Sequence, residues 1–165
     1  MKNRNTFPIY LSLLFALVLD ATYFNPSFEV IRPPLVLLTL IYWNIALPDK
    51  VGVSYSIVMG VLLDLLKGSI LGTHSLLFVL ISYLCQRFFY QFRVMRMIQQ
   101  SLILFFIFFL VKEFWLLNST LFGQMEVQIL SNESLFNAFS YAFLCAFAWP
   151  LVFYLLRNYR RRWIK

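Results

Sequence analysis

Four charged side chains fall inside long apolar stretches of the sequence, and they are the residues best placed to do chemistry. They are Asp20, Asp64, Lys112 and Glu113. A charge at the centre of a bilayer costs roughly 2.5 to 3.5 kcal/mol on insertion scales, so such residues usually mark a functional or packing site. We expect a network in which Lys112 pairs with Asp20 or Asp64. The alternative is that Lys112 and Glu113 extend to the membrane surface by themselves. Asp64 has a shorter side chain and is expected to be buried and hydrogen-bonded.

The other reactive side chains form no recognisable active site. Asp20 and Asp64 would formally provide the carboxyl pair of an intramembrane enzyme, but neither lies in a known catalytic motif. Metal binding needs clustered ligands, and nucleophilic catalysis needs a base at a suitable spacing from the nucleophile. The lone histidine, His74, is interpreted as a hydrogen-bonding residue near the membrane surface. We therefore predict that the protein is not an enzyme and has no metal or cofactor.

Small and polar residues recur at every fourth position around Asp64. The series is Gly52, Ser56, Gly60, Asp64, Gly68 and Gly72. On a helix such residues form a smooth stripe that allows another helix to approach closely. Two interpretations stay open, namely packing within this chain and contact with a partner protein. The segment from Gly68 to Gly72 is also predicted to form a tight turn, because glycine adopts backbone angles that other residues resist.

The composition indicates a membrane protein. Of the 165 residues, 61% are hydrophobic and 13% are charged, whereas a soluble domain has roughly a quarter of its residues charged. Six apolar segments are predicted to span the membrane: 7–24, 34–48, 51–66, 72–90, 98–117 and 136–156. We predict an all-α integral membrane protein in which residues 1–165 form a single six-helix transmembrane bundle.

Prolines and glycines set the ends of the two shortest segments. Pro33 and Pro34 open the segment 34–48 and Pro48 closes it, while Gly52 and Gly68 bracket the next one. These residue types break or cap helices. The first segment imitates a secretory signal, but it contains Asp20 and lacks a clear cleavage site, so we expect it to be retained as a span.

The distribution of basic residues predicts the orientation. With the N-terminus inside, 11 of the 14 Lys and Arg residues fall in cytoplasmic segments, and five of them lie in 157–165. Only Arg32 and Lys67 fall outside, and Lys112 lies within a span. Because basic residues accumulate on the cytoplasmic side, both termini are predicted to be cytoplasmic. The basic C-terminal end is expected to contact anionic lipids rather than nucleic acid.

Two stretches of the sequence resemble the rod shape-determining MreD family, in its proteobacterial form. They are Arg32-Pro-Pro with Tyr42-Trp43 and Leu47-Pro48, and Gly60-x-x-x-Asp64-Leu-x-x-Gly68-x-x-Leu-Gly72. The resemblance implies a non-catalytic scaffold subunit of the bacterial cell-elongation complex, which regulates cell shape from the inner membrane. The partner-binding or structural candidates are Arg32, Pro33, Pro48, Gly60, Asp64, Gly68 and Gly72.

The resemblance also implies partners and an alternative. MreC is the direct partner, while MreB, RodA and the elongation penicillin-binding transpeptidase belong to the same complex, which builds lateral peptidoglycan. We expect MreC to bind an outward-facing groove near Asp64 and the turn that follows it. The family is similar in fold to the substrate-binding subunits of energy-coupling-factor transporters. The alternative function is therefore a small-molecule or lipid-binding transporter subunit.

Overall fold

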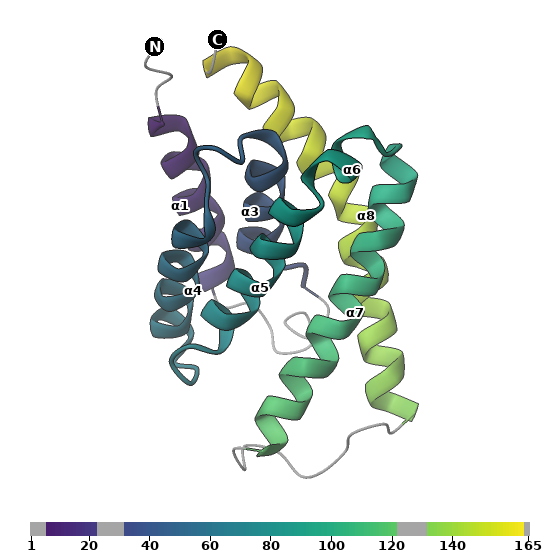
Figure 1. Cartoon of the computed structure of the whole chain (residues 1–165). Coiled ribbons are helices and arrows are strands. Elements are labelled where there is room, and N and C mark those ends of the chain that lie inside the picture. Colours follow the sequence, from purple (N-terminus) through teal and green to yellow (C-terminus); the bar gives the residue numbers. More distant parts are fainter. Residues whose placement is uncertain (1–5, 23–31, 122–131, 164–165) are drawn as a thin grey trace. The chain divides into compact units, whose positions relative to one another are not determined.

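The computed structural model describes residues 6–22, 32–121 and 132–163, and the regular secondary structure in these ranges is helical (Figure 1). The helices are α1 (Phe7–Ala21), α3 (Leu35–Ala46), α4 (Val53–Lys67), α5 (Thr73–Arg87), α6 (Phe89–Val94), α7 (Met97–Leu121) and α8 (Asn132–Trp163). The prediction of an all-α protein is confirmed for these ranges. A helix overlaps each of the six predicted segments, and the short helix α6 was not predicted as a separate element.

Two of these helices are long and apolar enough to cross a membrane. They are the Met97–Leu117 part of α7 and the Ser134–Trp163 part of α8. Only 17% and 22% of their most apolar stretches are buried, whereas a core helix of a soluble protein would be mostly buried. The other apolar helices are shorter than the roughly 17 residues needed to span a bilayer. Membrane crossing by the shorter helices therefore stays a prediction.

Large apolar side chains cover the outward faces of the helices. Phe15 of α1 is 66% exposed, Leu110 of α7 is 67% exposed and Phe147 of α8 is 76% exposed. Soluble monomers rarely expose large contiguous apolar patches, because water makes such surface costly. Lipid removes this cost, so the exposed faces fit a protein that lies within a bilayer.

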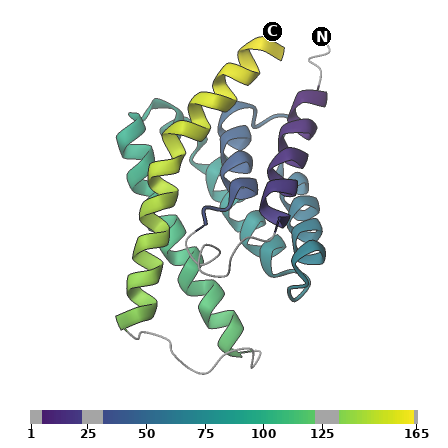
Figure 2. The same cartoon turned by 180° about the vertical axis from the view of Figure 1, so that it is seen from behind.

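The chain divides into two compact units. Unit 1 contains α1, α3, α4, α5, α6 and the end of α8 from Leu151, and unit 2 contains α7 and the first part of α8 up to Pro150. Within unit 1, α4 and α5 form a hairpin, α3 packs against α1 and α5, and α1 packs against α4 (Figure 2). Helix α3 is the most enclosed element, because ten of its twelve residues are buried, from Val36 to Ile45. Its sequence is accordingly apolar on most sides, and Thr39 and Asn44 are its buried polar exceptions.

Polar side chains connect three helices inside unit 1. Asn44 of α3 donates a hydrogen bond from Nδ2 to the hydroxyl of Ser82 in α5, at 3.1 Å. Gln86 of α5 donates from Nε2 to the side-chain oxygen of Asn44, at 2.9 Å. The hydroxyl oxygens of Ser56 in α4 and Ser82 lie 2.5 Å apart. Buried polar side chains need hydrogen-bond partners within the protein because no solvent reaches them, so this network fixes α3, α4 and α5 together.

Gly60 allows α4 and α5 to pack very closely. A Cβ atom built at Gly60 would lie within 3.0 Å of the backbone N and Cα of Ser75, which real Cβ atoms essentially never do. Ser56, one turn earlier, faces α5 as well through its contact with Ser82. The stripe of small residues therefore lies, at these two positions, against another helix of the same chain.

We expect Gly60→Ala to destabilise unit 1, because the new methyl group meets the backbone of Ser75, which has no rotamer to change. Overpacking of this kind typically costs about 1 to 3 kcal/mol. The measurement is the midpoint of thermal unfolding of the purified chain in detergent. Gly52→Ala is the matched control, since nothing lies within 4 Å of the added atom. Equal midpoints for the two variants would contradict the close contact.

Candidate functional site

The turn between α4 and α5 depends on two glycines with positive φ. Gly68 ends α4 with a φ of 64°, in the left-handed conformation, and Gly72 precedes α5 with a φ of 102°. Most L-residues avoid these angles, because their Cβ approaches the following carbonyl oxygen. The N–H of Ser69 donates to the carbonyl of Asp64 at 3.1 Å and closes the end of α4. The expectation of a glycine-dependent turn is confirmed.

The carboxylate of Asp64 organises this turn from the last part of α4. Its oxygens accept hydrogen bonds from the Ser69 hydroxyl at 2.7 Å, the Gly72 N–H at 2.8 Å and the His74 N–H at 3.2 Å. The ring nitrogen Nδ1 of His74 lies 2.7 Å from the same carboxylate. Asp64 is 0% exposed, so its charge is buried and compensated by donors of its own hairpin. Hydrogen bonds to a charged group contribute about 1.5 to 3 kcal/mol each, so the turn is held firmly.

Asp64 also serves as the N-terminal cap of α5. The residue at the usual capping position is Gly72, which has no side chain to accept a hydrogen bond from the first turn. The first N–H groups of a helix lack partners within the helix, and they carry a positive partial charge that favours an anion. The carboxylate of Asp64 reaches across the turn and provides both the hydrogen-bond acceptors and the negative charge. His74, interpreted from the sequence as a hydrogen-bonding residue, is one of its partners.

Asp20 does the same for α3. Its two carboxylate oxygens accept hydrogen bonds from the backbone N–H of Leu35 at 3.1 Å and of Val36 at 2.8 Å. The residue at the capping position of α3 is Pro34, which provides no side-chain hydrogen bond. Asp20 is 5% exposed, so a second buried carboxylate compensates a helix start in unit 1.

The charged residues of α7 belong to unit 2. The ammonium group of Lys112 lies 5.1 Å from the centre of the Tyr141 ring and 5.7 Å from that of Trp115, which are cation–π distances. One carboxylate oxygen of Glu113 is buried and has no hydrogen-bond partner among the described residues. The expected pairing of Lys112 with Asp20 or Asp64 would join the two units and stays a prediction.

The other sequence candidates lie at helix boundaries. Arg32 and Pro33 are half-buried in the segment before α3, whose capping residue is Pro34. Pro48 follows Leu47, at which α3 is capped. These positions agree with the predicted ends of the segment. A partner-binding role for them stays a prediction.

Comparison with known proteins identifies the family. The family model described as rod shape-determining protein MreD matches residues 1–159. The chain belongs to the MreD family. A curated relative, the rod shape-determining protein MreD of Haemophilus influenzae, is 28% identical over 156 residues, which cover 94% of this chain and 92% of the relative. No solved structure matches the chain.

Membership in the MreD family makes this chain a rod shape-determining membrane protein and not an enzyme. The resemblance derived from Arg32-Pro-Pro and from the residues around Asp64 is thereby confirmed. The similarity in fold to transporter subunits stays a prediction.

We expect Asp64→Asn to loosen the α4–α5 turn. The carboxylate has two acceptor oxygens, whereas an amide has one acceptor oxygen and an NH2 group. That NH2 group would face the N–H and O–H donors of the turn, with which it cannot form hydrogen bonds. Hydrogen exchange of the Gly72 and His74 amides should become about tenfold faster, which corresponds to roughly 1.4 kcal/mol. The measurement is hydrogen–deuterium exchange with mass spectrometry on the detergent-solubilised chain. Asp49→Asn is the control, since Asp49 is exposed in the turn before α4. Unchanged exchange in Asp64→Asn would show that the carboxylate does not hold the turn.

Proposed function

We propose that this MreD-family chain is a non-catalytic scaffold subunit of the cell-elongation complex, which binds MreC and helps to organise lateral peptidoglycan synthesis. The observation that carries the proposal is the α4–α5 turn, where a buried aspartate holds an exposed surface in one conformation. A preformed surface loses little conformational freedom on binding, so it suits a scaffold.

The proposed MreC surface consists of the exposed residues around this turn. Leu65 is 61% exposed, Leu66 is 47% exposed and Leu71 is 65% exposed. Gly68 is exposed between them and lets another backbone approach. Association of helices in lipid is driven by close packing and by small residues at the contact. A transmembrane helix of MreC that ends at the outer membrane surface fits this combination better than a polar ligand does.

The proposed orientation places the other end of the chain near the cytoplasmic filament. The last turn of α8 contains Arg160, Arg161 and Arg162. Anionic lipid heads attract such clusters, with about 1 kcal/mol per basic residue near the surface. In this arrangement MreB lies beside the basic end in the cytoplasm, and RodA and the transpeptidase belong to the same complex.

The transporter alternative has less support in the geometry. A substrate cavity needs a few polar side chains that are free to converge on a ligand. The carboxylates of Asp20 and Asp64 instead accept hydrogen bonds from their own chain. A ligand that used either residue would have to displace the cap of a helix.

The proposed orientation is multi-pass in the inner membrane, with both termini cytoplasmic. Green fluorescent protein fused after Lys165 should therefore be fluorescent, and alkaline phosphatase fused there should be inactive. Fusions within residues 122–131, between α7 and α8, should give the reverse pattern. The opposite result at either position would overturn the orientation.

The proposed surface predicts the effect of Leu65→Trp on MreC binding. A bulky ring on an exposed position of α4 should prevent close packing of a second helix while remaining compatible with lipid. We expect the amount of MreC recovered with the tagged chain to fall at least fivefold, or about 1 kcal/mol in affinity.

Leu110→Trp is the matched control, because Leu110 is 67% exposed on α7 and lies outside the proposed surface. Asp64→Leu, which removes the support of the turn, should also lose MreC and rod shape. Full recovery of MreC with both Leu65→Trp and Asp64→Leu would place the interface elsewhere.

A further inference from the structure

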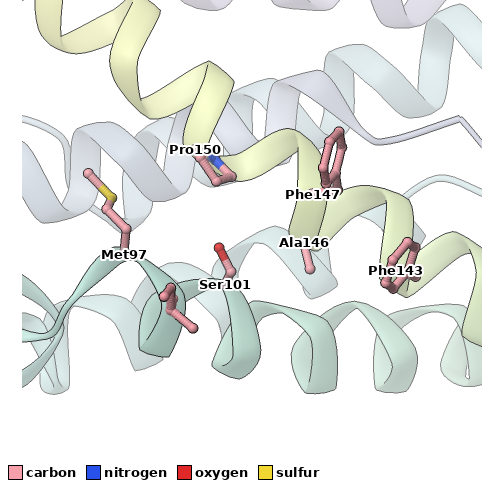
Figure 3. A pocket seen from close by; sticks show the side chains of 7 residues that line it. Met97, Ser101, Phe143, Ala146, Phe147 and Pro150 are labelled. Atoms are coloured by element: carbon pink, nitrogen blue, oxygen red, sulfur yellow. The ribbon is translucent and has the colours of Figure 1, made fainter.

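Unit 2 contains an apolar groove between the start of α7 and the middle of α8 (Figure 3). The groove has a volume of about 270 Å³ and is open on one side. Its walls include Met97, Ile98 and Ser101 from α7, and Ala146, Phe147 and Pro150 from α8. Figure 3 shows Ser101 and Ala146 on the facing sides of the two helices. Both side chains are short, so the space between the larger side chains stays open.

The groove is part of a fixed helix pair. Trp149 donates a hydrogen bond from its indole nitrogen to the side-chain oxygen of Gln100, at 3.2 Å, and both residues are buried. These residues directly neighbour Ser101 and Pro150 in the sequence, so the contact holds α7 and α8 together at the level of the groove. Pro150 lies inside α8 and has no N–H for the carbonyl of Ala146, which favours a local distortion of the helix.

The size and chemistry of the groove limit what it holds. Pockets for drug-sized ligands measure roughly 300 to 1,000 Å³ and contain a few placed polar groups. This groove is smaller and almost entirely apolar. Its rim is accessible from the surrounding lipid, since Ile98 is 80% exposed and Phe147 is 76% exposed. A flexible hydrocarbon chain that enters from the bilayer matches these properties.

A basic residue lies next to Met97, one of the residues that line the groove. Arg96 is exposed and immediately precedes α7. Its backbone N–H donates to the side-chain oxygen of Gln99 at 3.1 Å, which fixes the first turn. No acidic residue lies in that first turn. Glu113 is 16 residues after Met97, or about 24 Å along the helix, so its carboxylate does not offset the charge.

We infer that this groove binds one acyl chain of an anionic phospholipid, with Arg96, next to the lining residue Met97, holding the phosphate. The apolar walls accept the chain, and the guanidinium group together with the positive end of α7 attracts the headgroup. The site is independent of the proposed MreC surface, which belongs to unit 1. In the proposed orientation the start of α7 faces the cytoplasm, so the lipid comes from the inner leaflet.

The test uses the full chain in phosphatidylcholine vesicles that contain a phosphatidylglycerol with a photoactivatable group on its acyl chain. We expect cross-links to concentrate at Met97–Ser101 and Phe143–Pro150, and to fall at least fivefold in Ala146→Phe, which fills the groove. Ser101→Leu fills it from the other helix and should act in the same way. Leu110→Phe is the matched control, since Leu110 is exposed on α7 outside the groove.

The headgroup contact is tested with the same probe on phosphatidylcholine. The intact chain should be labelled several-fold more by the anionic probe, and Arg96→Gln should remove most of this preference while Arg87→Gln keeps it. Cross-links that are unaffected by Ala146→Phe and Ser101→Leu would overturn the site. Equal labelling of the intact chain by the two probes would overturn the anionic preference. Loss of MreC with unchanged lipid labelling in both groove variants would assign the groove to a protein helix instead.

Discussion

A helix that begins in a buried part of a protein needs acceptors for its first N–H groups, because water does not reach them. In unit 1 this requirement is met twice by an aspartate from another helix. Asp20 of α1 accepts hydrogen bonds from Leu35 and Val36, and Asp64 of α4 accepts them from Gly72 and His74. In both cases the local capping residue has no side-chain acceptor. The positions of α3 and α5 relative to the helices before them follow from these two carboxylates.

Close packing becomes possible once the helix starts are fixed in this way. Gly60 brings α4 against the backbone of Ser75, and the same approach places Ser56 within reach of Ser82. Neither contact would form if the hairpin closed with another register, since the turn from Gly68 to Gly72 sets which residues face each other. The polar network and the cap at Asp64 therefore stabilise one arrangement of α4 and α5 from both ends.

Most helices and their ends were predictable from local signals, whereas the partners of the charges were not. Hydropathy located six helical segments, and Pro34, Gly52 and Gly68 ended or began them as expected. The capping roles of Asp20 and Asp64 were not predicted. Their carboxylates accept hydrogen bonds from N–H groups 8 to 16 residues further along the chain, which is beyond the range of any local capping motif. The hydrogen bonds between Asn44, Ser82 and Gln86 were not predicted, because these residues lie within apolar segments. An Asp near the end of one apolar segment, followed by a segment that starts at Pro or Gly without a capping side chain, is the signal that would have found the caps.

The compensation of the charges within the chain bears on how an MreD-family protein acts. If the carboxylates of Asp20 and Asp64 were free, binding of ions or polar ligands would be the simplest use for them. Since both accept backbone hydrogen bonds, these two charges maintain shape, and the exposed surface around the α4–α5 turn is largely apolar side chains and glycine backbone. Such surface suits helices and lipid chains, whose contacts in a membrane depend largely on close packing. A rigid unit that presents such an apolar surface is suited to positioning other proteins.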